Sequence, residues 1–465
     1  MGYLSTSTLA NLSSTQVNAF STSQFAKLGA SQVQAVATTV IANLSSDLIG
    51  NLTADQIAGL TTNQIASIST AGLVKLGSSQ ISNLVTGQIS ALTTSALNAL
   101  LTTQVAGIET ADLAALTSTQ VGALGTNALG KLSSSQVKAI TTSQLGGLST
   151  SQLASVSSTS IVGLTTAQLA ALSSDQLSNL STDQVGALTT AQASSLTTAK
   201  LANMTSTQIG KLSTNAIAAM SSNQISSLTS SQFGGLSTGQ IVALTTADIV
   251  SLTNGQLQAL SSTQVSKIET SDVLAMSNSQ IRDFSTTQLQ GLTTDQIQTL
   301  ENEDLLALST AQVSALTTDQ ASALKASQAT PFNVGQISAM TTSQANALST
   351  SFLAAINSTQ ANALTTDQLN AISSSNLRSL TTTALAGLST AQLSALSSTN
   401  LDGLQTSQVQ ALSSSQVGAL STTQINTMGS AQVNALATGA LAGLTTSNLQ
   451  GISTTLMSTL ASSVS

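Results

Sequence analysis

The chain has 465 residues and a net charge of −7, with 6% charged, 2% aromatic and 41% hydrophobic residues. Cys, His and Trp are absent, which excludes disulfides, thiolate or imidazole metal sites and the usual general base. No basic patch for nucleic acid and no run of about 18 apolar residues that would span a membrane is found. The first residues lack the basic and apolar regions of a classical signal peptide.

An eight-residue repeat runs through the chain. Every residue number that leaves remainder 4 on division by eight holds Leu, Ile, Val, Met or Phe, from Leu4 to Leu460, giving about 58 octads without insertion or deletion. A second apolar residue follows five positions later, and the residue before it is Gln in most octads. We therefore predict one continuous octad array over residues 4–465, with a lead-in at 1–3.

The octad that begins at Leu52, LTADQIAGL, carries two helix N-terminal signatures in one register. Thr53 and Gln56 fit the N-cap and N3 positions of a capping box, and Leu52 and Ile57 fit the positions of a hydrophobic staple. The pattern predicts one short helix per octad. A single continuous helix is excluded, because its apolar seam would drift by roughly 80° per octad. A β-solenoid with an eight-residue repeat is the alternative that the β-branched content supports.

The rare charged residues favour helices, because acids stabilise the first turn of a helix and bases the last. The helical register puts most acids at its start: Asp47, Asp55, Asp175, Asp183, Asp295, Asp319 and Asp367 at N2, Glu109, Glu269 and Glu301 at the N-cap, and Asp112, Asp248, Asp272 and Asp304 at N3. Most bases fall at the end: Lys27, Lys75, Lys131, Lys211 and Lys267 just before the leucine, and Lys138, Arg282 and Arg378 one earlier. Lys200 and Lys325 break this rule.

Helices this short are unstable alone, so they must stack on one another. We expect an all-α solenoid with two or three octads per superhelical turn and both apolar positions inside. The small residues that precede each leucine let neighbouring backbones approach. Pro331 lies late in an octad that also has Lys325 at the cap and Ala329 in the second apolar position. This octad, at 325–332, is expected to be kinked or locally loosened.

The densest charged region offers the best candidate for chemistry. It contains Glu269, Asp272, Arg282, Asp283, Glu301, Glu303 and Asp304. A carboxylate pair for acid/base work or an oxygen-ligated Ca²⁺ site would use such residues. Capping of helices on a solvated face explains them better, and no base is placed to activate a Ser or Thr. We therefore expect no catalytic residues, cofactor site or metal site, and no enzyme.

The units LTTDQIQTL, LSTDQVGAL and LTTAQLAAL resemble octapeptide arrays of low-complexity bacterial surface and secreted proteins, which are often called adhesin-like or haem-utilisation-like. Haem binding is not expected without His or Cys, and with Tyr3 as the one tyrosine. The resemblance implies an extracellular or cell-surface location, reached by a route without a classical signal peptide or with a leader absent from this sequence.

The expected function is structural. Rows of Ser, Thr, Gln and Asn with little charge suit association of copies of the chain into a filament or matrix. Because the terminal octads keep their apolar residues, head-to-tail stacking is expected beside lateral packing. The alternative is an adhesin stalk, or a surface for polysaccharide or ice.

Overall fold

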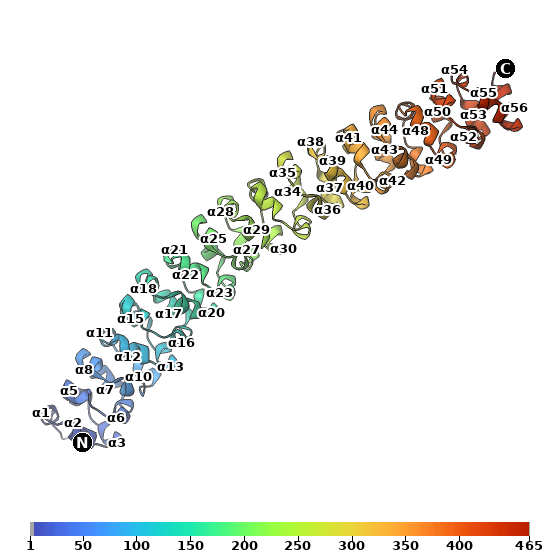
Figure 1. The fold of residues 1–465 in the computed structure, drawn as a ribbon. Helices are drawn as coiled ribbons and strands as arrows, with labels where there is room; N and C mark the ends of the chain where they lie inside the picture. The colour runs from blue at the N-terminus through green and yellow to red at the C-terminus, as the bar shows by residue number, and fades with distance from the viewer. Residues whose placement is uncertain (1–3, 465) are drawn as a thin grey trace. The chain divides into compact units, whose positions relative to one another are not determined.

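The computed structural model describes residues 4–464, except for the side chains at 459 and 461–464. These residues form 56 short α-helices and one 3-10 helix, and no described residue lies in a strand. The predicted all-α solenoid is confirmed, and the β-solenoid is not formed. The lead-in predicted at 1–3 lies outside the described residues. The chain divides into two compact units, at residues 1–236 and 237–465, within which helices follow one another in chain order (Figure 1).

Helices three apart along the chain pack against each other within each unit, so three octads make one turn and each unit has three columns of stacked helices. The columns of the first unit are as follows. The first is α1 (Thr6–Ala10), α4 (Ala30–Gln34), α7 (Ala54–Gly59), α10 (Ser78–Ser82), α13 (Thr102–Ala106), α16 (Thr126–Leu129), α19 (Thr150–Ser155), α22 (Ser174–Ser178), α25 (Thr198–Asn203) and α28 (Ser222–Ser226). The second is α2 (Ser14–Asn18), α5 (Thr38–Ile41), α8 (Thr62–Ser67), α11 (Thr86–Ser90), α14 (Thr110–Ala115), α17 (Ser134–Ala139), α20 (Ser158–Ile161), α23 (Thr182–Gly186), α26 (Ser206–Ile209) and α29 (Ser230–Gly234). The third is α3 (Thr22–Phe25), α6 (Ser46–Gly50), α9 (Thr70–Leu73), α12 (Thr94–Ala99), α15 (Ser118–Gly122), α18 (Thr142–Gly146), α21 (Thr166–Ala171), α24 (Thr190–Ser194) and α27 (Thr214–Ala218).

The second unit has the same arrangement. Its first column is α30 (Thr238–Val242), α33 (Ser262–Val265), α36 (Thr286–Gly291), α39 (Thr310–Ala315), α41 (Val334–Ala339), α44 (Ser358–Ala363), α47 (Thr382–Ala386), α50 (Thr406–Gln410), α53 (Ser430–Ala435) and α56 (Thr454–Val464). The second is α31 (Thr246–Val250), α34 (Thr270–Ala275), α37 (Thr294–Thr299), α40 (Thr318–Ala323), α42 (Thr342–Ala347), α45 (Thr366–Ala371), α48 (Thr390–Ala395), α51 (Ser414–Gly418) and α54 (Thr438–Leu441). The third is α32 (Asn254–Gln258), α35 (Asn278–Arg282), α38 (Asn302–Ala307), η1 (Ala326–Gln328), α43 (Thr350–Ala355), α46 (Ser374–Leu377), α49 (Ser398–Asp402), α52 (Thr422–Thr427) and α55 (Thr446–Gly451).

Nearly every described octad contains a helix of four to six residues, and two to four residues join it to the next helix. In α7, Thr53 is extended (φ −72°, ψ 163°), and its side chain accepts a hydrogen bond from the backbone N–H of Gln56. The helix ends at Leu60, which is extended again (φ −65°, ψ 144°). The capping box is present, as predicted. Leu52 and Ile57, the predicted staple pair, are both buried, so the core contains both apolar positions of the repeat.

Small residues allow close approach between turns, as the sequence predicted. A Cβ added to Gly107 would lie 2.8 Å from the carbonyl oxygen of Ser78, and one added to Gly291 would lie 2.5 Å from that of Ser262. Each pair joins the end of one helix to the first turn of the helix stacked beside it. Because no described glycine has a positive φ, these glycines serve to bring two backbones together.

The octad that contains Pro331 departs from the pattern. It forms the 3-10 helix η1 in place of an α-helix, so the octad is irregular, and the kink or loosening expected there stays a prediction. The stacking bonds of this octad persist, because Gln328 Nε2 donates to the carbonyl oxygens of Ile297 and Leu300, both at 2.9 Å.

Candidate functional site

The glutamine at N3 is the polar group that connects successive turns. In α7, the Oε1 atom of Gln56 accepts the backbone N–H of Thr53 at 2.8 Å. Its Nε2 donates to the carbonyl oxygens of Leu28, at 2.7 Å, and Phe25, at 3.0 Å. The Phe25 carbonyl ends α3, where a helix has no internal partners for its last C=O groups, and the Leu28 carbonyl lies in the corner that follows this helix. Each such glutamine therefore caps the start of one helix and the end of another.

The same geometry recurs along the chain, from Gln56 to Gln432. The glutamine side chains are mostly buried, and a buried amide is stable only when its donors and acceptor are satisfied. The sequence predicted only the hydrogen bond that Oε1 accepts, and not the hydrogen bonds that Nε2 donates to the neighbouring turn. The use of Gln at most N3 positions and of Glu at none is the signal that could have revealed these donated bonds, because a capping box accepts either residue.

Four aspartates occupy the glutamine position and lack its N–H donor. Asp272 Oδ1 accepts from Thr246 Oγ1 at 2.6 Å, and Asp112 Oδ1 accepts from Thr86 Oγ1 at 2.7 Å. Both threonines belong to the neighbouring helix in the same column. Asp248 Oδ2 instead accepts from the backbone N of Thr245, at 2.9 Å, within its own octad. These carboxylates are used as structural acceptors.

Asp304 occupies the fourth of these positions, and the pKa of its carboxyl is raised. Its Oδ2 accepts the backbone N–H of Glu301 at 3.0 Å, and the residue is 2% exposed. Burial raises the pKa of the Asp304 carboxyl, the charges of Glu301 and Glu303 raise it further, and the Glu301 hydrogen bond opposes them. The predicted first-turn placement of Asp304 is confirmed, and Glu303 lies in the same turn.

The candidate chemical residues do not form one site. Glu269 and Asp272 lie at the start of α34, Arg282 and Asp283 at the end of α35, and Glu301, Glu303 and Asp304 at the start of α38. Arg282 Nε lies 3.8 Å from Asp283 Oδ1, and Asp283 Oδ2 is buried without a hydrogen-bond partner. No group of three acidic side chains among the described residues is arranged to hold a metal ion.

Lys200 and Lys325 did not fit the rule that bases lie at the end of their own helix. In the structure, each one reaches the end of a different helix. Lys200, at N3 of α25, donates its ammonium to the carbonyl oxygens of Ala170 and Leu169 at the end of α21. Burial lowers the pKa of the Lys200 amine. Lys325 donates to the carbonyl oxygen of Gln298 at 2.9 Å. Each ammonium thus lies at the negative end of a different helix.

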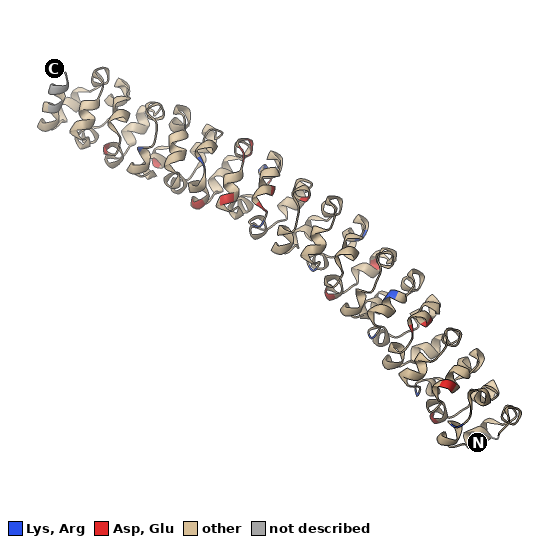
Figure 2. Ribbon diagram, turned by 180° about the vertical axis from the view of Figure 1, so that it is seen from behind, with Lys and Arg blue, Asp and Glu red and all other residues tan. Residues whose placement is uncertain are grey.

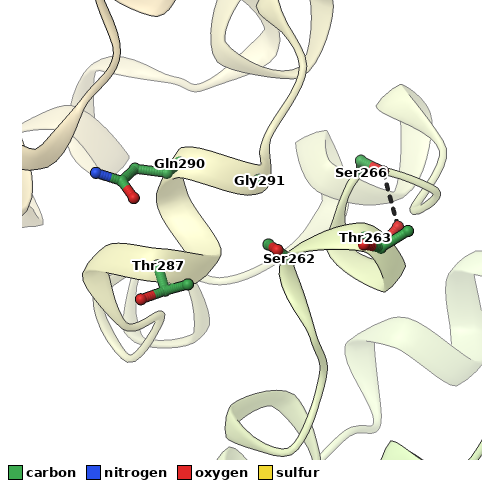
Figure 3. Close-up of a pocket in the computed structure, with 6 residues that line it drawn as sticks. All are labelled: Ser262, Thr263, Ser266, Thr287, Gln290 and Gly291. Carbon is green, nitrogen blue, oxygen red and sulfur yellow. Dashed lines mark hydrogen bonds between the residues drawn. The ribbon is translucent and has the colours of Figure 1, made fainter.

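Shallow polar hollows recur on the surface. One, of about 320 Å³, is lined by Ser262, Thr263, Ser266, Thr287, Gln290 and Gly291, between α33 and α36 (Figure 3). The six equivalent repeat positions line another hollow, between α10 and α13: Ser78, Ser79, Ser82, Thr103, Ala106 and Gly107. These two hollows hold hydroxyl and amide groups and no charged side chain. Because the same hollow recurs at equivalent repeat positions, it is a feature of the repeat and not a unique catalytic centre.

The fold and its capping network define a repeat protein, a solenoid of short helices. Five segments of the chain match the ALTTAQ repeat, at residues 105–142, 161–198, 201–238, 265–302 and 297–330. The search among curated proteins found no match. None of the described helices is both long and apolar enough to cross a membrane.

Proposed function

We propose that this protein has a structural role and assembles side by side with copies of itself. The observation that carries the proposal is the repetition of its outer surface. The N-cap and N2 residues are exposed in nearly every described octad, and the N1 residues are exposed or half-buried; most residues at these three positions are Ser or Thr. A contact that two copies make at one turn is available again 24 residues later. Weak contacts repeated in this way add up to strong association.

Low charge supports the same role. Only 6% of residues are charged, and the charged residues lie sparsely along the ribbon (Figure 2). Charge is what normally keeps proteins apart in solution. The resemblance to bacterial surface and secreted arrays supports an assembly outside the cell. The head-to-tail mode stays a prediction beside the lateral one.

A polysaccharide is the alternative partner, favoured by the exposed hydroxyl rows. Aromatic rings supply the large flat apolar surface that a binding site commonly uses. Here Phe25, Phe233, Phe284, Phe332 and Phe352 are all buried. The exposed polar rows are therefore better suited to another polar row than to a flat sugar ring.

Sedimentation velocity over a hundredfold range of protein concentration tests the proposal, with negative-stain microscopy of the same samples. We expect the mean mass to rise with concentration and laterally paired particles to appear. A chain that stays monomeric over the whole range, and instead binds saturably to a neutral polysaccharide, would support the alternative. A monomer that binds neither contradicts both.

A further inference from the structure

Acidic residues avoid one column of helices in the second unit, and the single charged residue in the octads of that column is Lys267, at the end of the octad of α33. All eleven acidic residues of this unit lie on the other two columns: Asp248, Glu269, Asp272, Asp295, Asp319 and Asp367 on the second, and Asp283, Glu301, Glu303, Asp304 and Asp402 on the third. In the first column, seven successive helices carry no charge in their octads: α36, α39, α41, α44, α47, α50 and α53. We call the exposed residues of these seven octads the neutral face.

The same segregation occurs in the first unit. The octads of α12, α15, α18, α21, α24 and α27, which form the later part of its third column, carry no charged residue. Helices on the other two columns alternate with them along the chain and carry Glu109, Asp112, Asp175 and Asp183. The N2 position accepts aspartate readily, because the helix dipole favours it there. Asp47 occupies this position on α6, in the earlier part of the same column, so folding does not explain why the later part lacks aspartate.

We propose that the neutral face binds the neutral face of a second copy of this chain. The proposal rests on the lateral self-association proposed above and names the surface that carries it. Two copies that met through their acidic columns would bring carboxylates together, and removing charges from water is costly. Contact through the neutral face avoids both penalties.

The chemistry of the neutral face is complementary to itself. Its exposed side chains include Thr287 and Gln290 on α36, Thr359 on α44 and Thr383 on α47. Hydroxyl and carboxamide groups both donate and accept hydrogen bonds, so a row of them can pair with an identical row. A two-fold relation between copies presents the same patch on both sides. Figure 3 shows Thr287 and Gln290 on α36, which line one side of the hollow whose other side is formed by residues of α33.

Charge substitutions on this face provide the test. The triple variant Thr287→Asp, Thr359→Asp and Thr383→Asp places acids at exposed N2 positions, where aspartate occurs naturally in other octads. The matched control, Ser343→Asp, Ser415→Asp and Thr423→Asp, adds the same charge at exposed N2 positions of α42, α51 and α52 on the other columns. Circular dichroism should show unchanged helix content in both variants.

We expect the first variant to need at least a tenfold higher concentration for half-maximal association than wild type, and the control to differ from wild type by less than threefold. Equal weakening of both variants would overturn the inference, because net charge and not the face would be responsible. No weakening of the first variant would also overturn it. A wild-type chain that is monomeric throughout contradicts lateral assembly itself, so the two failures are distinguishable.

A mixing experiment tests whether the neutral face binds the neutral face of a second copy. The variant Thr287→Lys, Thr359→Lys and Thr383→Lys should associate as poorly as its aspartate counterpart when alone. An equimolar mixture of the lysine and aspartate variants should recover association, since opposite charges then face each other. If the mixture stays as weak as its components, the neutral face binds a different surface and the inference is wrong.

Discussion

The side-chain Nε2 atom of Gln320 lies 2.7 Å from the carbonyl oxygen of Leu292, twenty-eight residues earlier in the chain. It also lies 2.7 Å from the carbonyl oxygen of Leu289, and Gln320 Oε1 accepts the backbone N–H of Thr317 at 2.9 Å. One side chain thus joins the start of α40 to the end of α36. Because each isolated helix is too short to be stable, such bonds between turns help to make the stack possible.

The substitution Gln320→Glu tests the hydrogen bonds that Gln320 Nε2 donates to the carbonyl oxygens of Leu289 and Leu292. The new side chain keeps the acceptor for Thr317 but places a buried negative charge against two carbonyl oxygens. We expect a loss of about 2–4 kcal/mol in stability around α40, measured by amide hydrogen exchange of that segment. Lowering the pH should reduce the loss, since a protonated carboxyl can donate.

The control for this prediction is Thr318→Glu, which adds the same charge at an exposed position of the same helix. Its effect should stay within about 0.5 kcal/mol, because a first-turn acid is compatible with the helix dipole. If both variants lost the same stability, the amide donor would not be the cause.

Asp304→Asn should stabilise the protein. Asparagine keeps an acceptor for the Glu301 N–H and adds a donor for the neighbouring turn, as Asn400 does toward the carbonyls of Leu369 and Ile372, both at 3.1 Å. A gain of about 1 kcal/mol is expected at neutral pH. Denaturant unfolding followed by circular dichroism measures it.

The pH dependence of that gain follows from the raised pKa of Asp304. Folding favours the protonated carboxyl, so the wild-type chain gains stability as pH falls through the raised folded pKa. The advantage of Asp304→Asn should therefore be largest at neutral pH and shrink in acid. The matched control, Asp295→Asn, removes a favourable first-turn charge and should instead destabilise slightly at neutral pH. A gain that grows in acid would contradict the assignment.

The sequence predicted local structure better than stacking geometry. Thr53, Gln56 and Ile57 were assigned correctly, because caps and staples depend on residues a few positions apart. The choice between two and three octads per turn stayed open, because it depends on contacts 24 or more residues apart. The donor role of Gln56 and the partner of Lys200 depend on the same contacts. For this reason Lys200 looked like an exception until its neighbours in space were known.

Pro331→Ala should convert η1 into an α-helix. Proline lacks the N–H that other octads use at this position, such as Gly107, whose N–H donates to the carbonyl of Gln104 at 2.9 Å. The gained hydrogen bond and the increased entropy of the unfolded chain oppose each other, so net stability should change by less than about 1 kcal/mol. In hydrogen exchange of this variant, a protected amide on the substituted alanine would confirm the conversion, whereas an unprotected one would contradict it.

Gly163→Ala should destabilise the stack, because a Cβ at this position would overlap the carbonyl oxygen of Ser134 on α17. The neighbouring turns must then separate, with an expected loss of about 1–3 kcal/mol. Gly146→Ala is the matched control, since a Cβ there meets nothing within 4 Å and alanine favours the helix by about 1 kcal/mol. The denaturation midpoint should therefore fall for the first variant and rise for the second. Neither glycine has a positive φ, so backbone conformation cannot make the two midpoints shift in opposite directions. Equal shifts of both midpoints would refute the role of close approach between turns.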